Sequence, residues 1–278
     1  MFTDASSSNA LVVYGHVGFD VSTVAGKVTQ TVGGSAYYAA MAAAAQGAEV
    51  SLVSILGTDF PEAALKLGRL DISASPRGAG LSAVFTQTYD DRNEVIAFDG
   101  KLNVCADLNP ELIPLGTAEP SAILLTTAPP TQQTRALEWL QAQEFHGLIA
   151  IDTTLPYVTE FDALLQRYGL RIGVLFVNEV EYEALAQRPP PCTRTIVKRG
   201  SQGASLLQYG VCSHVPAPVA EQVRTITGAG DVLAGAFLAA YLNGRSSAEA
   251  LARAVAFATS YVEAGAECFH QNSMGDSA

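Results

Sequence analysis

The segment Arg224-Thr-Ile-Thr-Gly-Ala-Gly-Asp231, followed by the apolar run VLAGAFLAAYL, carries most of the information about this chain. Glycine loses more conformational entropy on folding than other residues, so two glycines this close together indicate a backbone requirement. If a helix begins here, the N–H groups of residues 228 to 231 have no intrahelical partner and can bind an anion, aided by the helix dipole. We therefore predict that Gly228, Ala229 and Gly230 form an anion-binding site with Asp231 beside it.

A carboxylate beside such a site has a specific chemical use. It can remove a proton from an attacking hydroxyl while negative charge builds on the group under attack, which is the chemistry of phosphoryl transfer. An ordinary glycine turn whose Asp231 caps a helix would have the same residues. The segment therefore needs support from the rest of the chain.

Composition narrows the class of protein. The chain has 278 residues, of which 49% are hydrophobic and 15% charged, so it is long and apolar enough for one large globular α/β domain. The net charge of -11 argues against a nucleic-acid or anionic-membrane partner, since both need a basic surface. The four cysteines show no CxxC or Cys/His spacing. With a polar N-terminus and no apolar run of membrane-spanning length, we expect a cytoplasmic protein.

Short β-rich runs alternate with helical segments along most of the sequence. ALVVY at 10–14 and EVSLVSIL at 49–56 flank an alanine-rich helical stretch, and SAILLTT, GLIAID, RIGVLFV and TRTIVK follow with helical stretches between most of them. This alternation predicts an α/β fold with a doubly wound, mostly parallel sheet flanked by helices. No repeat or boundary divides the chain, so we expect one domain over residues 1–278.

Two segments interrupt the alternation. Residues 81–98 contain two strand-like runs around Asp-Asp-Arg-Asn, which predicts a hairpin with a polar turn. Together with residues 21–32 they predict a small antiparallel sheet outside the main one. Such a sheet would cover the open edge of the fold as a lid.

The Thr-Gly-Ala-Gly-Asp segment and the helix of small residues after it resemble the C-terminal signature of the ribokinase-like, or PfkB-type, carbohydrate kinases. Further motifs of that family occur in the same order, and together they span residues 11 to about 265. They are Gly15-His-Val-Gly-Phe-Asp20, Gly33-Gly34, Leu56-Gly-Thr-Asp59, Asn178-Glu-Val-Glu181 and Lys198-Arg-Gly200-Ser-Gln-Gly203.

The resemblance implies an α/β fold with a β lid, ATP as phosphoryl donor with Mg²⁺, and a homodimer formed through the lid. It also implies a role for each matching residue. Asp231 would be the catalytic base, beside an anion hole of Gly228, Ala229 and Gly230. Asp20 would bind substrate hydroxyls, and Gly33 and Gly34 would let the lid hinge. Asn178 and Glu181 would order the metal through water, and phosphate would be contacted by Lys198, Gly200 and Gly203.

Two of these assignments have structural alternatives. Asn178 and Glu181 also have the spacing of a capping pair at a helix start, and both interpretations can hold together. Lys198 can instead be a solvated residue at the end of a strand.

The sequence limits the substrate only to a small polyhydroxylated molecule: a sugar, a cyclitol or a nucleoside. Ribose-binding members carry an Asn where this chain has the pair Tyr37-Tyr38, so ribose specificity is not supported. The two rings could pack against a substrate or simply within the helix. His16 lies in the motif on the substrate side and is predicted to contact the substrate. Thr225 replaces an Asp that many members use near a monovalent cation.

The sequence is compatible with two classes of function and disfavours a third. The main hypothesis is an ATP-dependent kinase. The alternative is a non-catalytic ligand-binding or regulatory protein on the same fold. A Rossmann dinucleotide-binding protein is disfavoured, because the first strand is followed by GHVGFD and not by GxGxxG.

Overall fold

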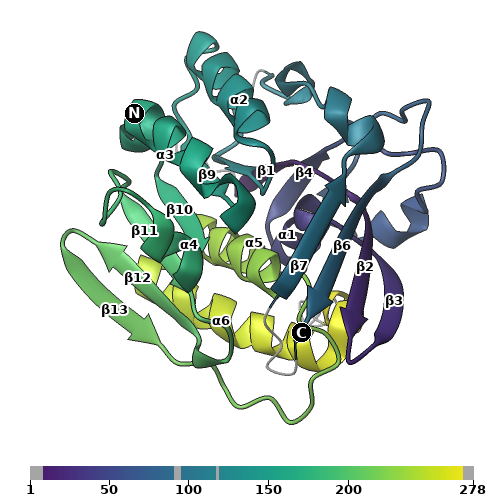
Figure 1. Ribbon diagram of the computed structural model, residues 1–278. Helices are drawn as coiled ribbons and strands as arrows, with labels where there is room; N and C mark the ends of the chain where they lie inside the picture. The colour runs from purple at the N-terminus through teal and green to yellow at the C-terminus, as the bar shows by residue number, and fades with distance from the viewer. Residues whose placement is uncertain (1–8, 91–94, 117–118, 272–278) are drawn as a thin grey trace, which may run out of the picture.

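The structure is a computed structural model that describes residues 9–90, 95–116 and 119–271. Its centre is a nine-stranded sheet in the order β13-β12-β11-β10-β9-β8-β1-β4-β5 (Figure 1). The strands are β1 (Ala10–Tyr14), β4 (Glu49–Val53), β5 (Leu70–Asp71), β8 (Ala122–Leu125), β9 (Leu148–Asp152), β10 (Val174–Asn178), β11 (Arg194–Lys198), β12 (Ala204–Gln208) and β13 (Val211–Val215). All pairs from β5 to β11 are parallel, and β12 and β13 continue the sheet antiparallel. The predicted mostly parallel sheet is confirmed.

Helices cover both faces of this sheet. On one face lie α1 (Ser35–Ala45), α5 (Ala229–Leu242) and α6 (Ser247–Ala264), and on the other lie α2 (Pro130–Ala142) and α3 (Val158–Tyr168); two short helices, α4 (Glu179–Ala184) and α7 (Cys268–Gln271), complete the set (Figure 1). Because both faces are covered, central strands such as β8, with the sequence AILL, are buried throughout.

The small residues of α1 and α5 have a packing role. A Cβ added to Gly235 on α5 would lie 2.0 Å from the carbonyl oxygen of Ala39 on α1, so the two helices approach each other at backbone distance. The alanines of α1 are almost all buried in this contact and against the sheet. This packing fixes the N-terminus of α5 relative to the strand ends. Among the described residues, no helix has both the length and the hydrophobicity needed to cross a bilayer.

A second sheet forms the lid, in the order β3-β2-β6-β7. Its strands are β2 (Gly18–Val24), β3 (Lys27–Gly33), β6 (Ala83–Tyr89) and β7 (Val95–Lys101), which overlap the segments predicted at 21–32 and 81–98. The expectation of a wholly antiparallel lid is wrong, since β2 and β6 pair in parallel. The reason is that the chain passes through α1 and β4 of the main fold before it returns to the lid. The turn predicted at residues 90–93 lies, apart from its first residue, outside the described part of the chain.

Candidate active site

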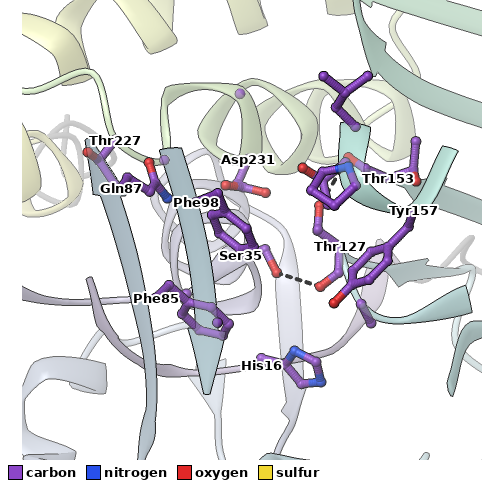
Figure 2. Close-up of a pocket in the computed structure, with 18 of the residues that line it drawn as sticks. His16, Ser35, Phe85, Gln87, Phe98, Thr127, Thr153, Tyr157, Thr227 and Asp231 are labelled. Carbon is purple, nitrogen blue, oxygen red and sulfur yellow. Dashed lines mark hydrogen bonds between the residues drawn. The ribbon is translucent and has the colours of Figure 1, made fainter. Parts of the chain in front are cut away.

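The candidate site lies where parallel strands end. His16 follows β1, Thr127 follows β8, Asp152 ends β9, Asn178 ends β10 and Lys198 ends β11. The carboxyl ends of parallel strands meet at one edge, where open α/β sheets bind ligands. A pocket of about 560 Å³ lies at this edge, bounded by the strand ends, the start of α5 and lid residues (Figure 2).

The glycine pair has a clear structural reason. Gly228 precedes α5 with a φ of +81°, a conformation that favours glycine, and a Cβ there would lie 2.3 Å from the ring of Tyr38. A Cβ on Gly230 would meet the side chain of Lys198 at 3.3 Å. Both glycines line the pocket, so the backbone at the start of α5 is open to a ligand.

The N–H groups at this terminus differ from the prediction at one position. Within the described chain, the N–H groups of Gly228, Gly230 and Asp231 have no hydrogen-bond acceptor, as expected for an anion-binding helix start. The N–H of Ala229 instead donates to the carbonyl of Ile226 at 3.2 Å, because the chain makes a tight turn into the helix. The prediction that Ala229 offers a free N–H is therefore wrong in this conformation.

Asp231 lines the pocket beside these N–H groups (Figure 2). Its burial, followed by the nearby charge of Asp152, raises the pKa of its carboxyl from 3.8 to about 7. Lys198 opposes this rise. A carboxyl group with a pKa near neutrality is suited to accepting a proton at physiological pH.

Asp20 on β2 lies at the junction of lid and main fold. It is 3% exposed, and its Oδ2 accepts hydrogen bonds from the Tyr38 hydroxyl at 2.7 Å and the Gly34 N–H at 3.4 Å. A Cβ at Gly33 would lie 2.1 Å from that oxygen, so the first glycine of the pair makes room for the carboxylate. Burial raises the pKa of Asp20, and these hydrogen bonds oppose the rise.

The tyrosine pair divides between the two roles considered for it. Tyr37 is buried against Phe269 and does not line the pocket, which is helix packing. Tyr38 lines the pocket, but through its hydroxyl it orients Asp20.

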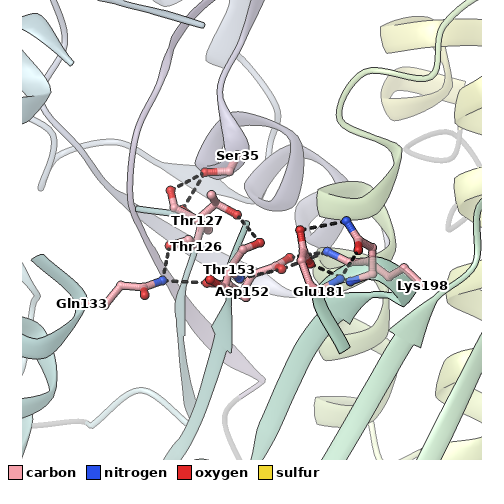
Figure 3. A network of polar contacts seen from close by, with 9 residues as sticks. Ser35, Thr126, Thr127, Gln133, Asp152, Thr153, Glu181 and Lys198 are labelled. Atoms are coloured by element: carbon pink, nitrogen blue, oxygen red, sulfur yellow. Dashed lines mark hydrogen bonds and ion pairs between the residues drawn. The ribbon is translucent and has the colours of Figure 1, made fainter. Parts of the chain in front are cut away.

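Lys198 is held in a buried ion pair and not in solvent. Its Nζ lies 2.8 and 2.9 Å from the two carboxylate oxygens of Asp152, and the side chains are 15% and 2% exposed (Figure 3). The solvated alternative for Lys198 is therefore wrong. Among the described residues that line the pocket, Lys198 is the only lysine or arginine. The Lys198 side chain lies 3.3 Å from the place where a Cβ on Gly230 would be, so Lys198 lies beside the start of α5.

Asn178 and Glu181 form a capping box at the start of α4. The Asn178 Oδ1 accepts from the Glu181 N–H at 2.8 Å, and the Glu181 carboxylate accepts from the Asn178 N–H at 2.7 Å and from its Nδ2 at 2.8 Å (Figure 3). Burial raises the pKa of Glu181 to about 7. Both residues line the pocket, but no set of three or more His, Cys, Asp or Glu in the described chain is arranged to hold a metal.

Gly200 and Gly203 lie outside the pocket lining. Both have positive φ values, +54° and +94°, in the turn that connects β11 to β12. A Cβ on Gly203 would lie 2.1 Å from the carbonyl oxygen of Val215, which explains this glycine structurally. Their contact with phosphate stays a prediction.

Several pocket residues were missed by the sequence analysis. Thr153 lines the pocket directly after β9, and its hydroxyl is buried without a hydrogen-bond partner in the described chain. Asp152, the last residue of β9, does not line the pocket but pairs with the pocket residue Lys198. Their position at a strand end was the available signal. Phe85 and Phe98 come from the lid and Tyr157 from the segment after β9 (Figure 2). Aromatic residues of this kind are usual in strands and give no signal of their own.

A buried carboxyl group beside free N–H groups, reached through a covered pocket, is what transfer of a phosphoryl group to a hydroxyl requires. The fold and the site thus place the chain in the class of small-molecule kinases. Residues 8–269 match the family model described as the pfkB family carbohydrate kinase, and the chain belongs to this family. It is therefore an ATP-dependent phosphotransferase that acts on a small molecule with several hydroxyl groups.

Individual relatives agree with this membership. A cytidine kinase from Thermococcus kodakarensis is 29% identical over 254 residues, which cover 84% of this chain and 89% of the relative. The nucleoside kinase of Burkholderia thailandensis in complex with inosine superposes with a TM-score of 0.76 at 18% identity, covering 92% of this chain and 91% of that one. The nucleoside kinase of Methanocaldococcus jannaschii gives 0.74 at 19% identity, covering 92% of each chain. These two structural matches show a shared fold.

Proposed function

We propose that the chain is a nucleoside kinase, which transfers the γ-phosphoryl group of ATP to a hydroxyl of a nucleoside. The observation that carries the proposal is the composition of the pocket. Asp231 and the open N-terminus of α5 lie at one end, and Phe85, Phe98 and Tyr157 provide aromatic surface for a planar base (Figure 2). The cytidine kinase from Thermococcus supports the same substrate class.

In the proposed reaction, each residue of the site has a separate task. Asp231 takes the proton of the attacking hydroxyl, and the N–H groups of Gly228 and Gly230 stabilise the charge on the phosphoryl group. Asp20 has one carboxylate oxygen held by Tyr38, which leaves the other to accept hydrogen bonds from the sugar hydroxyls. The β lid excludes water.

The donor set fits a magnesium ion that arrives with ATP. Mg²⁺ is usually held by one or two carboxylates together with substrate phosphates, and it keeps several waters. Glu181 lines the pocket, but its oxygens are occupied by the capping box, so Asn178 and Glu181 would hold the ion through water. The bound ion would neutralise part of the charge on the β- and γ-phosphates.

A sugar or cyclitol kinase is the second candidate. One observation favours it: Tyr38 stands where ribose-binding members carry an Asn, and its hydroxyl is committed to Asp20. The test is ADP release from Mg-ATP by the purified protein with nucleosides, pentoses, hexoses and cyclitols. ADP release that depends on a nucleoside supports the proposal, and release only with a free sugar or cyclitol contradicts it. Absence of ADP release with every compound, by a protein that still binds ATP, favours the non-catalytic alternative.

The pH dependence of the reaction should follow the titration of Asp231. Its carboxyl must be deprotonated to accept a proton, and its pKa is raised to about 7. We therefore expect kcat/KM to rise about tenfold per pH unit below pH 7 and to level off above it. A profile of kcat/KM from pH 5 to 9 with the preferred nucleoside measures this. A plateau that extends down to pH 5 would contradict the assignment of Asp231 as the base.

Replacing Tyr38 with phenylalanine should weaken substrate binding. The change removes the hydroxyl that orients Asp20 and keeps the ring against Gly228. A hydrogen bond to a charged group contributes about 1.5–3 kcal/mol, so kcat/KM should fall about tenfold to a hundredfold, mainly through KM. Tyr37→Phe, which alters a neighbouring buried ring without contact to Asp20, is the matched control. Equal kinetics of the two variants would show that Tyr38 acts only in packing.

A further inference from the structure

His16 lies at the other end of the pocket from Asp231 (Figure 2). It follows β1, is 1% exposed, and its imidazole stacks on the ring of Phe85 with 6.2 Å between centroids and 15° between planes. A base that enters between the lid and the strand ends would meet these two rings together. The hydrogen-bonding state of His16 therefore bears on which base is accepted.

Gln132 on α2 determines which nitrogen of His16 carries the hydrogen. Its Nε2 donates to the carbonyl oxygens of Cys105 at 3.0 Å and Ala106 at 3.3 Å, so turning the amide around would place its oxygen against these two carbonyl oxygens. The Gln132 Oε1 thus faces the His16 Nε2, at 2.7 Å. Since an amide oxygen only accepts, His16 must hold its hydrogen on Nε2.

The other ring nitrogen is then a hydrogen-bond acceptor. Burial lowers the pKa of His16 to about 4, so the ring is neutral at physiological pH and Nδ1 keeps its lone pair. No donor to Nδ1 occurs in residues 9–90, 95–116 and 119–271. The floor of the pocket therefore presents a fixed acceptor next to an aromatic surface.

We propose that the His16 Nδ1 accepts a hydrogen bond from the exocyclic amino group of the substrate's base, and so selects amino-bearing nucleosides over keto-bearing ones. The proposal rests on the nucleoside kinase function. A keto oxygen at the same place would put two acceptors against each other in a buried site, and unpaired buried polar groups are costly. Sites built around such hydrogen bonds discriminate strongly between substrates of nearly equal size.

The test compares substrates that differ at one group. We expect kcat/KM for cytidine to exceed that for uridine, or kcat/KM for adenosine to exceed that for inosine, by about tenfold or more, which corresponds to a hydrogen bond of about 1.4 kcal/mol. His16→Asn places an amide at the position of Nδ1, which can rotate to offer either an N–H or an oxygen, so the ratio should fall toward one. His146→Asn, on an exposed histidine, is the matched control and should keep the wild-type ratio.

The outcomes separate the two proposals. Equal use of both members of each pair by the wild type, a preference for the keto form, or an unchanged ratio in folded His16→Asn would overturn the role of His16 while the nucleoside kinase function stands. Absence of turnover with all four nucleosides, alongside turnover of a sugar or cyclitol, would overturn the nucleoside assignment and the selection together. The wild-type ratios need no variant, so a His16→Asn protein that failed to fold would still leave the proposal open to refutation.

Discussion

Asp231→Asn is expected to lower kcat by about a hundredfold to ten-thousandfold, which is the usual contribution of a positioned general base. The amide has almost the same shape as the carboxyl group and can remain beside the N–H groups of Gly228 and Gly230. It cannot accept the proton of the attacking hydroxyl. Substrate and ATP should still bind, so the loss should appear in kcat more than in KM.

The stability of the same variant gives a second readout. The folded-state pKa of Asp231 is raised from 3.8 to about 7, so its ionisation opposes folding progressively as the pH rises from about 4 to about 7. Removing the charge should leave the melting temperature at pH 8 unchanged or higher. Asp99→Asn, on an exposed lid residue, serves as the control for both measurements. Wild-type turnover by a folded Asp231→Asn protein would exclude Asp231 as the base.

The sequence was sufficient for features that depend on local pattern. Glycines at 228 and 230 before an apolar helix predicted an open helix N-terminus, and the spacing of Asn178 and Glu181 predicted a capping pair; both are present. The free N–H expected at Ala229 is used in a turn, because the exact path of the chain into a helix depends on residues on either side.

Features that depend on distant contacts could not be predicted in the same way. The parallel pairing of β2 with β6 follows from the route of the chain between them, which alternation of hydrophobic residues does not encode. Likewise, Asp152 is 46 residues from Lys198 in sequence, and only adjacency of β9, β10 and β11 brings them into contact. Lys198 was therefore open to the interpretation of a solvated strand end.

Lys198→Met should have the second large effect, on both stability and turnover. It leaves the Asp152 carboxylate buried without its partner, and breaking a buried ion pair costs about 3–5 kcal/mol. Protonation of Asp152, whose pKa burial already raises, offsets part of that cost. The sequence also predicts that Lys198 contacts phosphate, and on that prediction kcat/KM should fall about a hundredfold or more.

The double variant Asp152→Asn/Lys198→Met separates these two effects. It removes the Asp152 charge that Lys198→Met leaves without a partner, so its melting temperature should lie well above that of Lys198→Met. The recovery should stay short of the wild type, because Lys198 no longer offsets the buried carboxyl groups of Glu181 and Asp231. Its activity should stay as low as that of Lys198→Met, because the pocket, with Asp20, Glu181 and Asp231 in its lining, has lost the one lysine among its described lining residues. Thermal unfolding and kcat/KM are measured on the wild type, Lys198→Met and the double variant, and together they separate the effect on stability from the effect on turnover. If activity returned together with stability, the ion pair would be a structural support of the sheet edge, and the charge on the transferred phosphoryl group would have to be stabilised by the start of α5 and the metal alone.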